Sequence, residues 1–135
     1  MNQFLEKRTQ IFTYDVTGGD SGAIATHTLG MLPANAVITQ AWIHVLTTFS
    51  SAGSDAGTIS LGYTGAATAF DAATAISSGT TWDNAVPRVS DGAADAAVTN
   101  FIEIGTAELA VVAVTAVQII SAGKLLLVVE YYISD

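Results

Sequence analysis

Few residues of this chain have the types and spacing that chemistry requires. The sequence has two histidines, His27 and His44, and no cysteine. A serine or threonine nucleophile needs a base beside it, and each histidine lies in a strand-like segment with no acidic neighbour in sequence. Without cysteine the chain has no disulfide, thiolate nucleophile or zinc–thiolate site. We therefore expect no catalytic residue, and we interpret both histidines as hydrogen-bonded or surface side chains of strands.

Carboxylates offer no better case for a metal or a cofactor. The densest acidic segment, Asp91 to Asp95, has two carboxylates without the alternating ladder of an EF-hand loop. Three glutamates, Glu103, Glu108 and Glu130, fall in or beside expected strands, and nothing places two of them across a cleft as glycoside hydrolysis requires. We expect neither a metal site nor a cofactor site.

The remaining candidates are contacts to a partner. Trp82 lies in a long polar stretch, residues 77–100, with Arg88 nearby. Aromatic and arginine side chains anchor protein partners or stack on sugars when they are exposed, and fill a core when they are buried. We predict partner contacts through Trp82 and Arg88, and we assign Trp42, inside a strand, to the core or to packing between subunits.

The composition limits what the partner can be. Only 12% of the 135 residues are charged, with four Lys and Arg against twelve Asp and Glu, whereas soluble domains carry roughly 25% charged residues. The four cations (Lys7, Arg8, Arg88 and Lys124) are scattered and cannot neutralise a row of phosphates, so we expect no nucleic acid. A surface with few charges is less costly to desolvate against a protein.

The chain length fits one domain, which we place at residues 10–135 behind an N-terminal arm at 1–9. Phe4 and Leu5 are apolar residues in an otherwise polar arm, and we predict that they dock on a partner. The segment after the arm lacks the continuous apolar region of a signal peptide, so we expect synthesis in a cytoplasm. The longest apolar run, Leu109 to Ile120, is shorter than the roughly 20 residues of a membrane helix, and we expect no membrane span.

Short segments of period two, separated by turn residues, indicate an all-β sandwich with roughly seven to nine strands. The clearest strand, Val37 to Phe49, places Val37, Ala41, Ile43, Val45 and Phe49 on its core face and Gln40, Trp42, His44 and Thr48 on the other. The next strand, Thr58 to Tyr63, points Ile59, Leu61 and Tyr63 inward, and we expect the two strands to form a hairpin-like pair. The alanine-rich segment Ala66 to Ile76 is the only helix candidate.

The closing strand, Lys124 to Ile133, is expected to follow a tight turn at Ser121 to Gly123. Its core face would hold Leu125, Leu127, Val129, Tyr131 and Ile133. Its other face, with Leu126, Val128 and Tyr132 around Glu130, is apolar enough to predict cover by a neighbouring subunit. The predicted fold is a single-domain antiparallel β-sandwich with at most one short helix.

Three motifs carry a resemblance to a known family. The LPANAVI segment from Leu32 to Ile38, the strand end Thr47 to Phe49 and the closing segment Ser121 to Tyr132, which contains AGKLLLVVEY, resemble small virion structural proteins of tailed bacteriophages, in particular capsid decoration (cement) proteins, and the strand Thr58 to Tyr63 between them belongs to the same pattern. The resemblance covers most of the chain from about Leu29 onward. It implies a jelly-roll-like sandwich on the outer surface of an icosahedral head, commonly a homotrimer, bound to the major capsid protein.

Two alternatives of other classes stay open. One is a tail or fibre module that recognises host glycans through Trp82 and the 77–100 stretch. The other is an all-β enzyme such as a cupin, although cupins need a histidine cluster that two separated histidines hardly supply. The expected function is therefore non-enzymatic: a virion structural protein located on the capsid surface.

Overall fold

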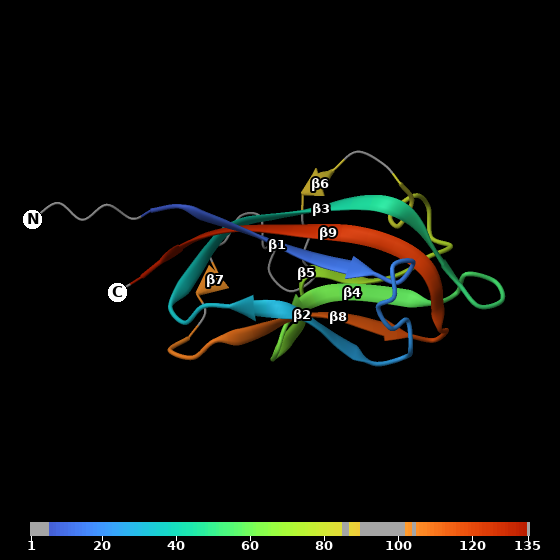
Figure 1. Cartoon of the computed structure of the whole chain (residues 1–135), viewed down its shortest axis with the longest axis horizontal. Coiled ribbons are helices and arrows are strands. Elements are labelled where there is room, and N and C mark those ends of the chain that lie inside the picture. Colours follow the sequence, from blue (N-terminus) through green and yellow to red (C-terminus); the bar gives the residue numbers. More distant parts are fainter. Residues whose placement is uncertain (1–5, 85–86, 90–101, 104, 135) are drawn as a thin grey trace, which may run out of the picture.

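The computed structural model describes residues 6–84, 87–89, 102–103 and 105–134. These residues fold into two antiparallel sheets packed face to face, with the strands along the long axis of the molecule (Figure 1). The strands are β1 (Arg8–Asp15), β2 (Thr26–Leu32), β3 (Ala36–Ser51), β4 (Thr58–Tyr63), β5 (Ala66–Ala75), β6 (Arg88–Val89), β7 (Ile102–Glu103), β8 (Leu109–Ala116) and β9 (Ile120–Ile133). The described residues contain no helix long and apolar enough to cross a membrane.

The strand order identifies the sandwich as a jelly roll. The first sheet has the order β1-β9-β3-β6, with β7 also paired to β3, and the second has the order β2-β8-β4-β5. Early strands pair with late ones: β1 with β9, β2 with β8, β3 with β6 and β7, and β4 with β5. A long hairpin of paired strands, rolled into two sheets, gives this nested pattern. The predicted jelly-roll-like antiparallel sandwich is confirmed.

Alternate side chains of the long strands fill the space between the sheets. The core residues of β9 are Leu125, Leu127, Val129 and Tyr131, with Ile133 packed beside them, as predicted. Ile59 and Leu61 of β4 face them from the second sheet, and Tyr63 packs against the same cluster. Fully burying a side chain of this size stabilises the fold by about 1.5–3 kcal/mol, so the period-two pattern specifies which way each strand faces.

An irregularity in β3 corrects one predicted face. The register with β9 shifts between Ile38 and Gln40, and this shift brings Ile38 onto the core face with Ala41. Val37, predicted on the core face, pairs with Tyr132 and shares the opposite side of the sheet with it. A β-bulge of this kind reverses the alternation on one side of the irregularity, so strict periodicity misassigns the residues before it.

The predicted hairpin of residues 37–49 with 58–63 is wrong. Each edge of β3 is occupied within the first sheet, by β9 on one side and by β6 and β7 on the other. The chain therefore crosses to the second sheet after β3, where β4 pairs with β5 and β8.

The helix candidate is also wrong, because Ala66 to Ala75 forms strand β5. Gly65, at φ 94°, turns the chain back on β4, and the hairpin buries Ala69, Phe70 and Asp71. The helix preference of alanine is worth only tenths of a kcal/mol per residue, so the strand pairing and burial outweigh it.

The turn before the closing strand lies earlier than predicted. Ser121 to Gly123 belong to β9, and the chain reverses at residues 117–119, where Val117 has φ 70°. Gly123, at φ 132°, is needed for a close approach: a Cβ there would lie 2.1 Å from the Phe49 ring. The glycine therefore marks tight packing within a strand.

Candidate docking surfaces

The four predicted contact residues fall in different environments. Phe4 and Leu5 of the predicted arm lie outside the described residues, and β1 begins at Arg8. Trp82 and Arg88 lie at the edge of the sandwich where β6 of the first sheet faces β5 of the second. Both side chains point inward.

Trp82 belongs to the core. Its side chain is fully buried, its Nε1 donates to the Thr74 carbonyl oxygen at 3.0 Å, and its ring meets Phe49 edge-on at 5.9 Å. The expectation of an exposed indole is thus corrected, because the segment before β6 folds back under the end of β3. A glycan-binding role through Trp82 would need an exposed indole face, which this placement does not provide.

Arg88 joins the two sheets. It pairs with the core residue Ile43 across the β3–β6 ladder, so its side chain points between the sheets. The guanidinium donates to both carboxylate oxygens of Asp71 on β5, at 3.1 and 2.8 Å, and lies 5.3 Å from the centre of the Trp82 ring. The guanidinium therefore links β6 of the first sheet to β5 of the second.

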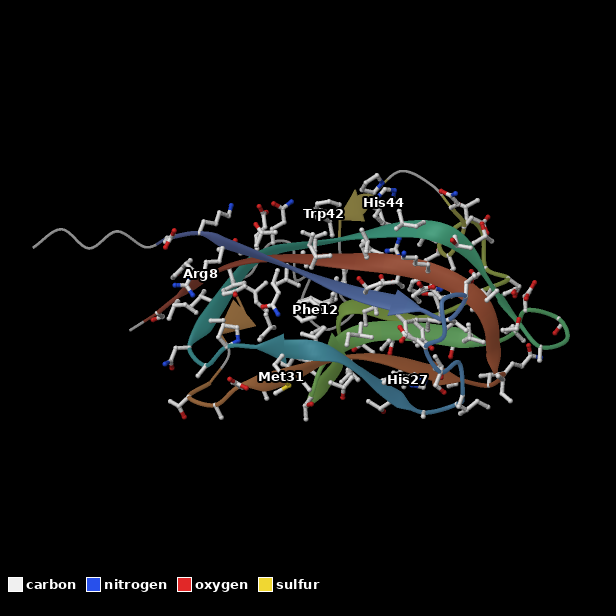
Figure 2. The ribbon with its side chains drawn as sticks, in the orientation of Figure 1. Arg8, Phe12, His27, Met31, Trp42 and His44 are labelled. Carbon is white, nitrogen blue, oxygen red and sulfur yellow. The ribbon has the colours of Figure 1, made fainter. Side chains whose placement is uncertain are left out.

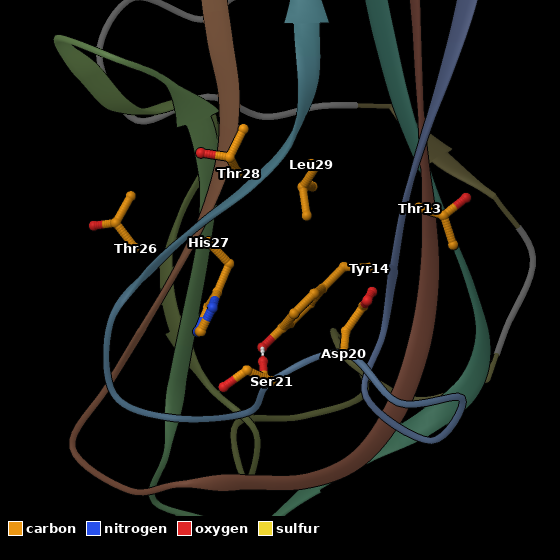
Figure 3. A pocket seen from close by; sticks show the side chains of 8 residues that line it. All are labelled: Thr13, Tyr14, Asp20, Ser21, Thr26, His27, Thr28 and Leu29. Carbon is orange, nitrogen blue, oxygen red and sulfur yellow. Dashed lines mark hydrogen bonds between the residues drawn. The ribbon is translucent and has the colours of Figure 1, made fainter.

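The opposite edge of the sandwich contains a polar cavity between β1 and β2 (Figure 3). Its volume is about 370 Å³, and Tyr14 and His27, whose rings stack with their centres 5.5 Å apart, form part of its wall. The Tyr14 hydroxyl donates to the Ser21 carbonyl oxygen at 2.8 Å. Burial, together with the nearby Asp20 carboxylate, raises the pKa of Tyr14 to about 12. The other lining residues are Thr13, Thr26, Thr28 and Leu29.

The side chains of this cavity do not form a reactive pair. His27 Nε2 lies 2.8 Å from the Ala23 carbonyl oxygen and 3.2 Å from Thr115 Oγ1, so the ring is held by partners within the fold. Tyr14 is protonated at neutral pH, as an ordinary tyrosine is, and its raised pKa makes the phenolate still harder to form. Over the described part of the chain, no three side chains of metal-ligating type gather at one place. The hydroxyl beside His27, that of Thr115, is buried, donates to the Ala23 carbonyl oxygen and does not line the cavity, so it is not presented to a substrate there.

The outer face of the first sheet carries a group of neighbouring apolar side chains. The strand registers place Ile11, Val128 and Trp42 in one row, and Thr13, Leu126 and His44 in the next. Figure 2 shows Trp42 and His44 on this outer side, while Phe12 points between the sheets. Ile11 is 59% exposed, whereas Val128 is buried beneath its row neighbours. Trp42 also lines a shallow depression of about 230 Å³ with Gln40, Pro87 and Arg88.

A second apolar surface lies at the end of the sandwich where β8 turns into β9. Val117 and Ile119 of the turn are 65% and 55% exposed, and Ile24, on the adjacent segment, is 54% exposed. Between them, Gln118 points inward, and its Oε1 accepts from Ser51 Oγ and from the Ala56 amide, both at 3.0 Å. The turn is therefore anchored from inside. A glutamine within the apolar run 109–120 is the sequence signal that locates it.

Comparisons with known proteins find similarity in structure and none in sequence. No protein-family model matches the chain, and no curated protein matches it. A chain in the structure "Cyanophage Pam1 capsid asymmetric unit" is similar with a TM-score of 0.67 and 18% identity, over 99% of this chain and 90% of that one. A chain in "Capsid of Ralstonia phage GP4" is similar with a TM-score of 0.63 and 18% identity, over 100% of this chain and 89% of that one. The chain thus has, over its whole length, the fold of chains found in phage capsids.

Proposed function

We propose that this protein is a non-enzymatic structural component of a tailed-phage virion, a decoration or cement protein on the outer surface of the icosahedral head. The observation that carries the proposal is the full-length likeness in fold to chains of two phage capsid structures. The family resemblance noted for the motifs at Leu32 to Ile38 and Ala122 to Tyr131 points to the same kind of protein. The partners are the major capsid protein and further copies of this chain. The resemblance implies a homotrimer, that is, three copies in one oligomer.

The mechanism is multivalent clamping. A chain with few charges offers mostly neutral contacts, each of them weak. Copies held in one oligomer bind several shell subunits at once, and the effective concentration raises the overall affinity by orders of magnitude without any single strong contact. The exposed apolar side chains of Ile24, Val117 and Ile119 supply one place for such contacts.

Imaging of purified particles with and without this protein tests the proposal. Regular density on the head, present only when the protein is present, is the expected result. Density confined to the tail, or particles that carry none of the protein, would overturn it. The non-enzymatic part of the proposal is tested on the same particles, since added protein should restore head stability without release of any small-molecule product.

The N-terminal arm is the shell contact that we propose within this function. Deleting residues 1–5, which include Phe4 and Leu5, leaves β1 and the Lys7–Glu130 ion pair in place. The shortened protein should keep its circular dichroism spectrum and lose its occupancy on particles. A matched control replaces Asn2 and Gln3 by serine and should bind normally. Unchanged occupancy of the deletion variant would remove the arm from the interface.

A further inference from the structure

We infer that the outer face of the first sheet is where one copy of this chain binds a second copy. The inference deepens the proposed function and rests on it, because that function calls for a homo-oligomer. It names the surface involved: the strip of Ile11, Val128, Trp42 and Leu126 that crosses β1, β9 and β3.

The strip has the layout of a protein interface. Its residues sit in neighbouring positions on three paired strands, where side chains in one row lie about 4.5–5.5 Å apart. Ion pairs border it towards both ends: Lys7 with Glu130 at 4.0 Å, and Lys124 with Asp15 at 3.7 Å. An apolar centre with a polar border is how interfaces between proteins are built.

The distribution of charge identifies the occupant as a like-charged molecule. The chain has a net charge of −8, yet all four of its cations lie in or next to the first sheet. Arg8 opens β1, and Arg88 sits in β6 with its charge turned inward to Asp71. The strip itself is bordered by Lys7 and Lys124 against Glu130 and Asp15, so the charges of these two ion pairs balance.

A strip bordered by balanced ion pairs on an acidic protein suits a second copy better than a basic partner. Two copies of net charge −8 repel each other over most of their surfaces, and the repulsion is least where each presents equal numbers of both signs. A basic partner would instead be drawn to the acidic remainder of the chain, which includes Asp55 and Glu108. The ion pairs at the two ends also let one copy meet the charges of the other with opposite signs.

Replacing Ile11 by Asp tests the contact. Ile11 is 59% exposed in the single chain, so the substitution should not disturb its fold, whereas a carboxylate against an apolar strip should weaken self-association about tenfold or more. Met31→Asp is the matched control, because this substitution adds the same charge on the other sheet. Met31 is 43% exposed and lies on β2. Mass is measured by sedimentation over a concentration series with the full-length chain.

The expected result is an oligomer for the parent and for Met31→Asp, and dissociation towards the 13.8 kDa single chain for Ile11→Asp. A single-chain mass for the parent at every concentration, or equal association of the parent and Ile11→Asp, would overturn the inference. If the parent protein formed the oligomer but did not bind particles, the proposed function would be contradicted, whereas the contact between copies would still stand. The two failures are therefore distinguishable.

Thiol labelling gives a second test that needs no disruptive variant. Because the chain has no cysteine, Thr13→Cys on the outer face of the first sheet and Thr28→Cys on β2 each provide one thiol. Both threonines are exposed in the single chain. Maleimide should modify Thr13→Cys several-fold more slowly at concentrations that favour the oligomer than after dilution, and Thr28→Cys at one rate throughout. Equal, concentration-independent rates for both would contradict the inference.

Discussion

The two long edges of the sandwich are closed by opposite kinds of chemistry. At the β1–β2 edge, Tyr14 stacks on His27, and the polar cavity remains open beside them. At the β5–β6 edge, the Arg88–Asp71 ion pair and the fully buried Trp82 fill the gap. Phe49 links the two closures through the core, since it lies 6.1 Å from the Tyr14 ring and 5.9 Å from the Trp82 ring.

The difference shows how each closure responds to damage. A neutral aromatic closure loses packing and one hydrogen bond when it is altered, and each loss is modest. A buried ion pair contributes little net stability because desolvation offsets the attraction between the charges. Removing one partner, however, leaves an uncompensated charge buried away from water. A single substitution at the ionic edge should therefore lower the free energy of unfolding more than one at the aromatic edge.

The largest effect is expected for Trp82→Ala. The substitution empties the space under Phe49 and leaves the Thr74 carbonyl oxygen without the indole donor. Large-to-small changes of a buried tryptophan cost about 3–5 kcal/mol, and this one should lower the free energy of unfolding, measured by urea denaturation, by about 4 kcal/mol. Trp42→Ala, at the half-buried outer face, is the control and should cost clearly less. Equal costs would contradict the core position of Trp82.

The next effect comes from breaking the ion pair on one side. Asp71 is 2% exposed and the Arg88 side chain 28% exposed, so Asp71→Ala leaves a largely buried guanidinium without this carboxylate. We expect a loss of about 3 kcal/mol of unfolding free energy. The double variant Asp71→Leu with Arg88→Met should recover most of that loss, because two apolar side chains replace both charges. A double variant as unstable as the single one would show that the closure depends on the charges themselves.

The β-sandwich could be predicted largely from sequence because its long strands follow the period-two rule, whereas the jelly-roll topology came only from the family resemblance. Leu125, Leu127 and Val129 alternate cleanly, and burial on one face forces that alternation. The prediction failed where a non-local contact overrides local preference. Ala66 to Ala75 has helix-forming residues, and only its pairing with β4 makes it a strand.

The closure of the β5–β6 edge was out of reach for the same reason. Asp71 and Arg88 are 17 residues apart, and their pairing depends on β5 and β6 meeting across the sandwich. Trp82 stands next to Asp83 and Asn84, which are typical of a surface loop, so its sequence neighbours indicated exposure. For the outer face of β9, by contrast, the sequence predicts cover by a neighbouring subunit, since the apolar residues Leu126, Val128 and Tyr132 stand at every second position around Glu130.

Alkaline pH should lower the free energy of unfolding through Tyr14, at the aromatic edge. The pKa of Tyr14 is raised from 10.0 to about 12 in the folded chain, mainly by burial and also by Asp20. Above pH 10 the unfolded chain loses this proton while the folded chain keeps it, so this contribution to stability is complete below pH 10 and disappears as the pH rises to about 12. The loss amounts to about 2–3 kcal/mol.

Unfolding free energies of the parent and Tyr14→Phe, compared at several pH values, isolate this contribution, because the other groups that titrate in this range are common to both chains. The difference between the two proteins should be constant up to pH 10 and then shift in favour of Tyr14→Phe. A constant difference up to pH 12 would mean that the Tyr14 hydroxyl ionises as freely in the folded chain as in the unfolded one.

The smallest effect is the neutral-pH cost of Tyr14→Phe. The change removes the hydrogen bond to the Ser21 carbonyl oxygen and keeps the ring stacked on His27. A neutral hydrogen bond contributes about 0.5–1.5 kcal/mol net, and the cavity beside Tyr14 is polar enough for water to reach the freed carbonyl, so we expect a cost of about 1 kcal/mol. His27→Ala provides the complementary measurement, since it removes the stacked ring and keeps the hydroxyl. If Tyr14→Phe cost as much as Asp71→Ala, the aromatic edge would depend on a single polar contact, and the contrast between a tolerant edge and an abrupt one would no longer hold.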